Sequence, residues 1–150
     1  MSNFLDKLSV RHMTKDDLDA IVEIDTKVLG EPRREYWVTK ILKQAENRPP
    51  DVSLVAEIDG KVAGFILGEV SGWEFKIPHN IGWIDTIGID PDYQNRGIAK
   101  VLAVALIENL QKYSVNIIYT LVNWNDWDLL QFFHAMGFSR GDMINLVLKV

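Results

Sequence analysis

The stretch from Ile87 to Leu110 constrains the fold of this chain more than any other, because it reads as the end of a strand, a tight turn and a long helix in direct succession. Before the turn, large apolar residues alternate with smaller ones, which is typical of a strand beside a core. Pro91 cannot donate to a strand ladder, so we expect the strand to end there. From Ile98 onward, apolar residues recur at intervals of three and four, which predicts an amphipathic helix.

The junction between this strand and this helix has the chemistry of an anion site. The first N–H groups of a helix have no partner within it, and the helix dipole places partial positive charge there. Gly97 and Ala99 carry almost no side chain, so an anion can approach the backbone, and Arg96 and Lys100 add positive charge. These features indicate a pyrophosphate cradle. The same residues also fit an ordinary strand–turn–helix in which the glycine only eases the turn.

The pattern Gln94-x-x-Gly97-x-Ala99 resembles motif A of the GCN5-related N-acetyltransferases, the GNAT family. That motif has Gln or Arg first, then Gly, then Gly or Ala, and its backbone amides hold the pyrophosphate of acetyl-CoA. A P-loop and a G-x-G-x-x-G motif are both absent from the chain. The cofactor-binding residues that the resemblance implies are Ile87, Gly88, Ile89, Gln94, Asn95, Arg96, Gly97, Ile98, Ala99, Lys100, Asp126 and Phe133.

The segment from Asp126 to Phe138 resembles motif B of the same family. Asp126 stands where the family has Asn, Phe133 stands where it has Tyr, and Gly137-Phe138 matches the motif. Each motif is weak alone, but the two in the right order around a strand form a strong joint signal. Asp126 is also a good N-cap for a last helix, and Gly137 is its natural C′ residue.

The remaining elements follow from apolar periodicity and turn residues. We expect strands at residues 8–12, 52–58, 61–70, 83–89, 116–122 and 143–149. A helix is expected from the Thr14 cap to Gly30, with an apolar stripe that includes Leu18, Ile21, Val22, Val28 and Leu29. A second helix is expected at about residues 34–46, and its apolar face has Trp37, Val38, Ile41, Leu42 and Ala45. Asp59-Gly60 predicts a hairpin between the second and third strands. The aromatic segment 71–80 reads as a loop that packs over a substrate.

This order of elements matches the GNAT fold over nearly the whole chain. The expected fold class is α/β, or α+β by some schemes, with a mixed, mostly antiparallel central sheet of about six to seven strands flanked by about four helices. With 150 residues and no linker or repeat, the chain is expected to form a single domain over residues 1–150.

Composition excludes several classes of function. Hydrophobic residues make up 47% and charged residues 25%, which is ordinary for a soluble globular protein. The net charge of −5 argues against a general nucleic-acid binder. The chain has no cysteine, and His12, His79 and His134 lack the spacing of metal ligands, so we expect no metal. No apolar run approaches membrane length, so we expect no membrane contact and a cytoplasmic protein.

The catalytic base is a point where the sequence departs from the family. Acetyl transfer to an amine requires removal of a proton and polarisation of the thioester carbonyl. The position of the Glu that often serves as base in the family is occupied here by Trp83. The nearest carboxylate on that strand face is Asp85, and Glu69 at the end of the preceding strand is the second candidate. Either carboxylate could instead be a buried polar group satisfied by its neighbours.

The general acid is a second departure. Many relatives have a Tyr at the position of Phe133, and a Phe cannot protonate the leaving thiolate. Because a thiol has a pKa of ~8.5, the thiolate can leave unaided. Tyr119 is another possible donor, although a Tyr in a strand more often serves packing.

The resemblance implies an N-acetyltransferase that moves an acetyl group from acetyl-CoA to an amine of a protein, peptide or small molecule by direct attack on the thioester. The alternative is a non-catalytic acyl-CoA-binding module of the same fold, since Trp83 and Phe133 replace two usual catalytic residues. The partners are then acetyl-CoA and an amine acceptor. The sequence neither requires nor excludes a homodimer. Nothing in the sequence selects the acceptor.

Overall fold

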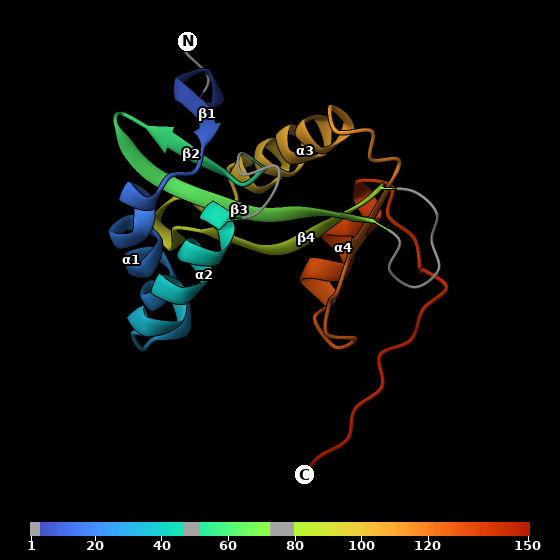
Figure 1. Ribbon diagram of the computed structural model, residues 1–150. Coiled ribbons are helices and arrows are strands. Elements are labelled where there is room, and N and C mark those ends of the chain that lie inside the picture. The colour runs from blue at the N-terminus through green and yellow to red at the C-terminus, as the bar shows by residue number, and fades with distance from the viewer. Residues whose placement is uncertain (1–3, 47–51, 73–79) are drawn as a thin grey trace.

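The computed structural model describes residues 4–46, 52–72 and 80–150 and shows one sheet with helices on both faces (Figure 1). The strands, in the order in which they lie side by side, are β1 (Leu8–His12), β2 (Leu54–Ile58), β3 (Lys61–Gly72), β4 (Asn80–Ile89) and β5 (Ile117–Thr120). The helices are α1 (Leu18–Leu29), α2 (Arg34–Glu46), α3 (Ile98–Gln111) and α4 (Trp127–Ala135). Three strand pairs are antiparallel and β4–β5 is parallel, as expected for a mixed sheet. The described residues form five strands, fewer than predicted.

The sheet separates two apolar clusters, one on each face. Helices α1 and α2 cover one face, and α3 covers the other. The cluster under α1 and α2 contains Ile21, Ile24, Trp37, Ile41, Val55, Val62, Phe65 and Leu67. The cluster under α3 includes Leu54, Ala56, Ile66, Ile84, Ile98, Leu102, Leu106 and Phe133. Successive residues of β2 enter opposite clusters, as the two-residue repeat of a strand requires.

The hairpin between β2 and β3 confirms the Asp59-Gly60 prediction. Both residues have positive φ, 52° and 76°, which suits a tight turn between antiparallel strands. Strand β2 begins later than expected, at Leu54, and β3 extends to Gly72, so the start of the predicted loop 71–80 is strand. Asn80 likewise opens β4. Residues 73–79, and with them the expected packing of this loop over a substrate, lie outside the described residues, as do Pro49 and Pro50 after α2.

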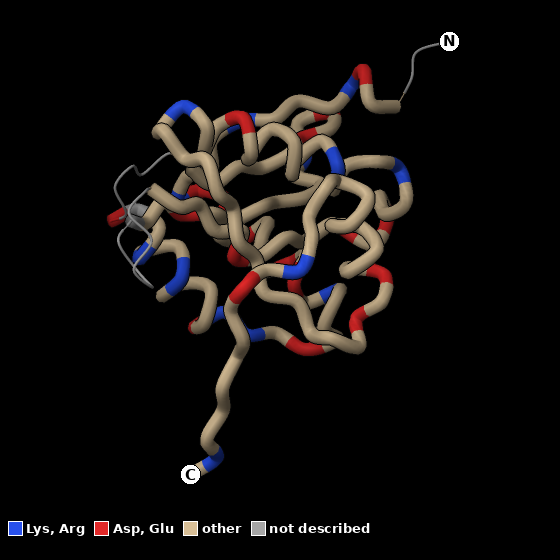
Figure 2. Tube along the Cα trace, turned by 90° about the vertical axis from the view of Figure 1, so that its right-hand side faces the viewer, with Lys and Arg blue, Asp and Glu red and all other residues tan. Residues whose placement is uncertain are grey.

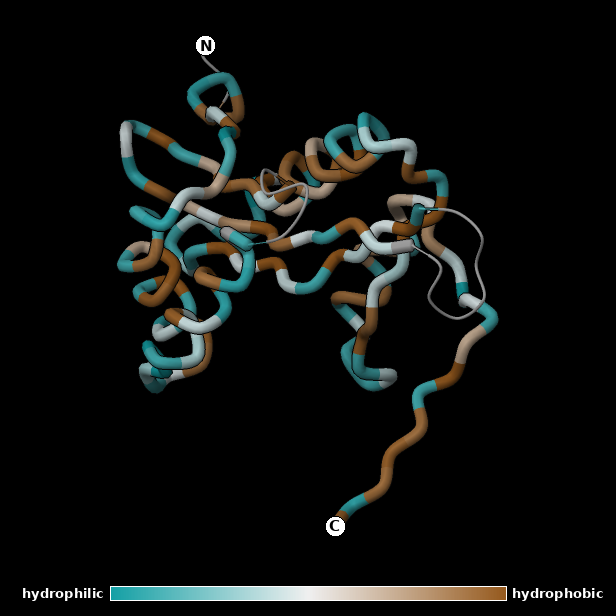
Figure 3. Tube along the Cα trace, viewed as in Figure 1, coloured by the Kyte–Doolittle hydropathy of each residue, from teal (hydrophilic) through white to brown (hydrophobic). Residues whose placement is uncertain are grey.

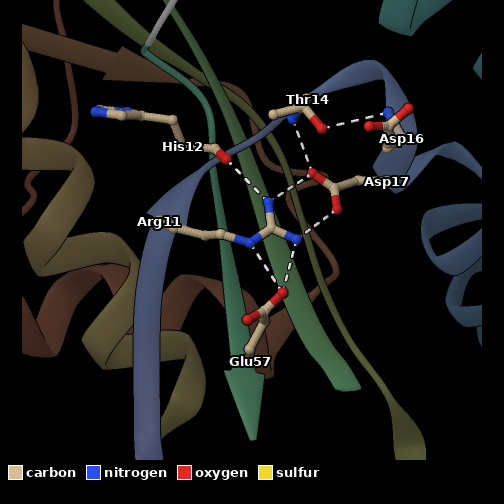
Figure 4. A network of polar contacts seen from close by, with 6 residues as sticks. All are labelled: Arg11, His12, Thr14, Asp16, Asp17 and Glu57. Carbon is tan, nitrogen blue, oxygen red and sulfur yellow. Dashed lines mark hydrogen bonds and ion pairs between the residues drawn. The ribbon is translucent and has the colours of Figure 1, made fainter. Parts of the chain in front are cut away.

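A polar network fixes the entry into α1 (Figure 4). Thr14, predicted as an N-cap, forms a capping box at a short 3₁₀ turn (Lys15–Asp17) that leads into the helix. The guanidinium of Arg11 donates to both carboxylate oxygens of Asp17, at 2.9 and 2.7 Å, and to Glu57 at 2.8 Å. The network therefore joins β1, β2 and the start of α1.

The buried faces of α1 and α2 differ in part from the predicted stripes. In α1, Val28 and Leu29 are 53% and 50% exposed, while Ile24 is buried in their place. Val28 lines an open cleft described below, which accounts for its exposure. In α2, Trp37 is buried as predicted, but Leu42 lies in the exposed part of the helix.

The C-terminal segment contradicts the sequence prediction most clearly. Helix α4 begins at the Asp126 cap and is followed by Gly137 with φ of 96°, as expected. The predicted strand Met143–Lys149 does not form, because no strand of the described chain pairs with it. Residues 141–150 are exposed and run away from the body of the molecule (Figure 1). Strand β5 is also shorter than the predicted 116–122.

None of the helices in the described part of the chain combines the length and apolarity that crossing a bilayer requires.

Candidate active site

A β-bulge in β4 shapes the centre of the site. Leu67 pairs with Thr86 and Gly68 pairs with Ile84, so Asp85 is an extra residue in β4. A bulge bends its strand and redirects a side chain, and bulges are common beside active sites. The last β5 residue in the ladder is Thr120, whose Oγ1 donates to the Ile84 carbonyl at 3.0 Å. Beyond that bond, β4 continues to Ile89 with no β5 residue paired to it. The unpaired edge of β4 borders a cleft.

The cleft has a volume of about 720 Å³ and lies where β4 and β5 part. Strand β4, the start of α3 and α4 form most of its walls. Its lining includes every residue that the family resemblance assigned to cofactor binding except Arg96, namely Ile87, Gly88, Ile89, Gln94, Asn95, Gly97, Ile98, Ala99, Lys100, Asp126 and Phe133. The guanidinium of Arg96 instead lies 4.9 Å from the centroid of the Phe4 ring.

The backbone at the start of α3 explains the glycine of motif A. Gly97 is the N-cap and has φ of 90°, a conformation that side-chain-bearing residues rarely adopt. A Cβ atom at Gly97 would lie 3.5 Å from Leu5, which is ordinary contact, so conformation and not space requires the glycine. Asn95 is also left-handed, with φ of 64°. The first amides of α3 have no helical partner and adjoin the cleft, as an anion site needs.

An ion pair that the sequence analysis missed anchors the loop before α3. Asp90 is 1% exposed, and its carboxylate accepts bonds from Nζ of Lys27 at 3.1 Å and from the Asp92 amide at 3.0 Å. The hydrogen bond to Asp90 raises the pKa of Lys27. Helix α1 is thereby tied to the loop that leads into α3. No local pattern could have revealed a partner so distant in the chain.

A second cavity of about 320 Å³ shares the lining residue Asp85 with the first. Helix α2 supplies most of its lining, and Glu69 and Asp85 supply the rest. The α2 residues are Tyr36, Thr39, Lys40, Lys43 and Gln44. Asp85 borders both cavities, so the structure brings the two predicted base candidates together at the junction.

Lys40 forms the closest charged contact of this junction. Its Nζ lies 2.6 Å from Oδ2 of Asp85, with the two side chains 24% and 36% exposed. Burial lowers the pKa of Lys40, but the hydrogen bonds and charges of Asp85 and Tyr36 together outweigh burial, so the pKa is raised overall. Lys40 is not among the site residues predicted from the sequence. The four-residue spacing of Tyr36 and Lys40 shows a shared helix face, but not which strand that face meets.

Tyr119 and Phe133, the two aromatic residues considered for departure of the thiolate, have different surroundings. Tyr119 borders neither cavity, and its ring packs 5.2 Å from that of Trp83. The Trp83 Nε1 donates to Ser71 Oγ at 3.0 Å, so the residue at the family's Glu position is held by packing and a hydrogen bond. Phe133 is 5% exposed and packs against Phe138 while also bordering the large cleft.

The chain matches the model of the Acetyltransferase (GNAT) family over residues 18–138. It is 27% identical to an uncharacterized N-acetyltransferase of Methanocaldococcus jannaschii, over 99% of this chain and 68% of the relative. An acetyltransferase of Pectobacterium atrosepticum is 24% identical over 93% of each chain.

Solved structures show the same fold. An aminoglycoside N-acetyltransferase in complex with CoA superimposes with a TM-score of 0.79, at 16% identity, over 95% of this chain and 94% of the other. The family match spans well over half of the chain and includes both motifs. This chain therefore belongs to the GNAT family of acetyl-CoA-dependent acetyltransferases.

Proposed function

We propose that this protein transfers the acetyl group of acetyl-CoA directly to an acceptor amine of a protein, peptide or small molecule. The observation that carries the proposal is the position of Asp85, which borders both the large cleft and the smaller cavity. Two substrates bound in these two spaces would meet at this residue. The family match supports acetyl-CoA as the donor.

Acetyl-CoA would occupy the large cleft. Its pyrophosphate would bind the amides of Arg96 to Lys100 at the start of α3, where the helix dipole favours an anion. Its pantetheine arm would lie along residues 85–89 of β4, whose edge is not covered by β5. The thioester would then reach the bulge, while the acceptor enters through the cavity under α2.

The transfer needs one base. The amine nitrogen attacks the thioester carbonyl carbon, its proton passes to the base, and the carbon–sulfur bond breaks to release the CoA thiolate. We assign the base to Asp85 first and to Glu69 second. Lys40 holds Asp85 in place through the 2.6 Å ion pair. We assign no acid, because Tyr119 borders neither cavity and a thiol with a pKa of ~8.5 is a fair leaving group.

The test compares Asp85→Asn and Glu69→Gln with the natural protein. Turnover is followed as thiol release from acetyl-CoA over a panel of amines, and CoA affinity is measured by calorimetry. We expect Asp85→Asn to lower turnover by about 10²–10⁴ with CoA affinity unchanged, since that is the usual effect of removing a general base. Equal turnover in Asp85→Asn and a loss in Glu69→Gln would transfer the role to Glu69.

The second candidate function is an acyl-CoA-binding module without catalysis. Trp83 and Phe133 favour it, because each fills a family catalytic position with a side chain that cannot transfer a proton. CoA binding without thiol release for any amine in the panel would support this alternative over the enzyme.

A further inference from the structure

Lys40 places a primary amine beside the carboxylate to which we assign the role of base. Its Nζ lies 2.6 Å from Oδ2 of Asp85, which is within the reach that proton transfer to a general base requires. Asp85 borders both cavities, and Lys40 borders the smaller one. The Lys40 side chain is 24% exposed, so its nitrogen is accessible. An acceptor amine in the smaller cavity must approach the same carboxylate, and Lys40 already lies there.

The packing of helix α2 directs Lys40 to this carboxylate. The helix carries both hydrophobic and hydrophilic residues (Figure 3), and its buried Trp37 and Ile41 pack in the core on this face of the sheet. Tyr36 and Lys40, one turn apart, share a neighbouring face of the helix and line the smaller cavity. A lysine has a flexible four-carbon stem, so its nitrogen can move toward the large cleft while the helix stays in place.

The other lysines separate the two features that Lys40 combines. Lysine and arginine residues are spread over the whole molecule (Figure 2). Lys27 also pairs with a carboxylate, Asp90 at 3.1 Å, but it lines neither cavity. Lys43 lines the smaller cavity and Lys100 lines the large cleft, but neither forms an ion pair with a described residue. Among the described lysines, Lys40 alone has both a cavity and a carboxylate partner.

We propose that this protein acetylates its own Lys40, with acetyl-CoA in the large cleft as the donor and Asp85 as the base. The inference rests on the proposed transfer of acetyl from acetyl-CoA, and it adds a modification site. The Lys40 ammonium gives one proton to the Asp85 carboxylate, and the amine attacks the thioester carbonyl carbon. The carbon–sulfur bond breaks, and the thiolate takes a second proton from the nitrogen. The products are acetyl-lysine and CoA thiol, and Asp85 returns its proton to water.

Acetylation of Lys40 changes the site that produces it. Acetyl-lysine is neutral, so Asp85 loses the cation with which it pairs. The acetamide group remains in the smaller cavity, through which we expect an external acceptor to enter. Lys40 and an external amine therefore compete for one carboxylate. An amine that the enzyme turns over should protect Lys40, and a protein without acceptor should block its own acceptor cavity.

The first test is incubation of the natural protein with acetyl-CoA and no added amine, followed by peptide mass spectrometry. We expect acetylation at Lys40 ahead of Lys27, Lys43 and Lys100, with release of a single equivalent of CoA thiol per chain. Lys40→Arg should release none, because a guanidinium keeps its proton. Dilution of the protein by about tenfold should leave the modified fraction at a given time unchanged, since amine and base lie in one molecule. Equal labelling of all four lysines, or a fraction that falls on dilution, would overturn the proposal.

Variants test the route of the proton and the source of the acetyl group. Asp85→Asn should slow Lys40 acetylation by about 10²–10⁴, the usual effect of removing a general base. Glu23→Gln is the matched control, because it removes a carboxylate from the ion pairs of another lysine, Lys27, and should leave the rate unchanged. Circular dichroism verifies that both variants are folded. Excess free CoA, which needs no variant, should suppress the labelling of Lys40. Unchanged labelling in Asp85→Asn or under excess CoA would refute the proposal.

The panel of amines separates this inference from the proposed function. Thiol release with an added amine, in a protein whose Lys40 stays unmodified when that amine is omitted, would refute self-acetylation alone. Modified Lys40 without turnover of any amine would support self-acetylation and refute transfer to an external acceptor. A protein that neither releases thiol nor modifies Lys40 would contradict both.

Discussion

Nζ of Lys40 lies 2.6 Å from Oδ2 of Asp85, and this contact joins helix α2 to the bulge of strand β4. Asp85 borders both cavities and Lys40 borders the smaller one, so the pair brings one negative and one positive side chain to this place. The ammonium group of Lys40, on helix α2, fixes the orientation of the Asp85 carboxylate on the sheet. The arrangement of the proposed base therefore depends on the packing of α2 against the sheet.

The ion pair makes a prediction for the titration of Lys40. Burial lowers the Lys40 pKa, and Asp85 and Tyr36 together raise it by more. Asp85→Asn removes the larger of these two raising contributions and should therefore lower the pKa. Nuclear magnetic resonance of the lysine Cε–Nζ groups measures the change. Glu69→Gln is the control, because it removes a carboxylate of the same cavity and leaves the Lys40 partner in place. A Lys40 pKa that does not move in Asp85→Asn would mean that the pair is not formed in solution.

The anion site predicts a charge effect at Gly97. Gly97→Glu should weaken CoA binding at least tenfold by calorimetry, because it brings a negative charge to the start of α3. Gly97→Gln is the matched control, since it has the same size and the same strain at φ of 90° without the charge. The difference in CoA affinity between the two variants measures the electrostatic part of the loss of binding. Equal CoA affinities would contradict pyrophosphate binding at the start of α3.

The network around Arg11 predicts a pH dependence of stability. Burial raises the pKa of Asp17, but the bonds from Arg11 and from the Thr14 amide lower it by more, so the folded pKa is below its ordinary value. The stabilisation is complete above the unfolded pKa of ~3.9 and is lost as the pH falls through the lower folded value. Asp17→Asn should cost about 2 kcal/mol of unfolding free energy at pH 7, because charge-assisted bonds are lost.

Denaturant titrations between pH 7 and pH 2 measure this effect. The difference between Asp17→Asn and the natural protein should shrink as the pH falls below about 4. Asp16→Asn is the control: its carboxylate is exposed and has no ion pair in the described structure, and it should change stability little. A difference that is constant over this pH range would contradict the lowered pKa.

The burial of Phe133 leads to different expectations for two substitutions. Phe133→Ala should cost ~3–5 kcal/mol of stability, because the ring is 5% exposed and packs against Phe132 and Phe138. Phe133→Tyr should change maximal turnover by less than about threefold if the thiolate leaves without an acid. Thermal melting and steady-state turnover measure the two effects. A hundredfold gain in Phe133→Tyr would favour the binding module over the enzyme.

The local parts of this fold could be predicted because their causes are local. The cap at Asp126, the turn at Asp59-Gly60 and the C′ position of Gly137 each depend on a few neighbouring residues. The same holds for the strand–turn–helix at the proposed anion site. The resemblance of motifs A and B to a known family then extended these pieces to a whole fold.

The missed features depend on contacts between distant segments. The strand pattern of Met143–Lys149 is genuine, but a strand forms only when the segment lies along a neighbouring strand, and this segment runs away from the sheet. The Lys27–Asp90 and Lys40–Asp85 pairs join helices to a strand end and a bulge far along the chain. The bulge at Asp85 also has no local signal, because it is a mismatch between two strands.

The two cavities that meet at Asp85 have a kinetic consequence. Donor and acceptor would arrive through different entrances and occupy the enzyme together, so initial-rate plots against either substrate should intersect and not run parallel. Free CoA, as a product, should compete with acetyl-CoA for the cleft but not with the amine. Excess amine should likewise leave the donor's entrance open, so that substrate inhibition by the acceptor is weak.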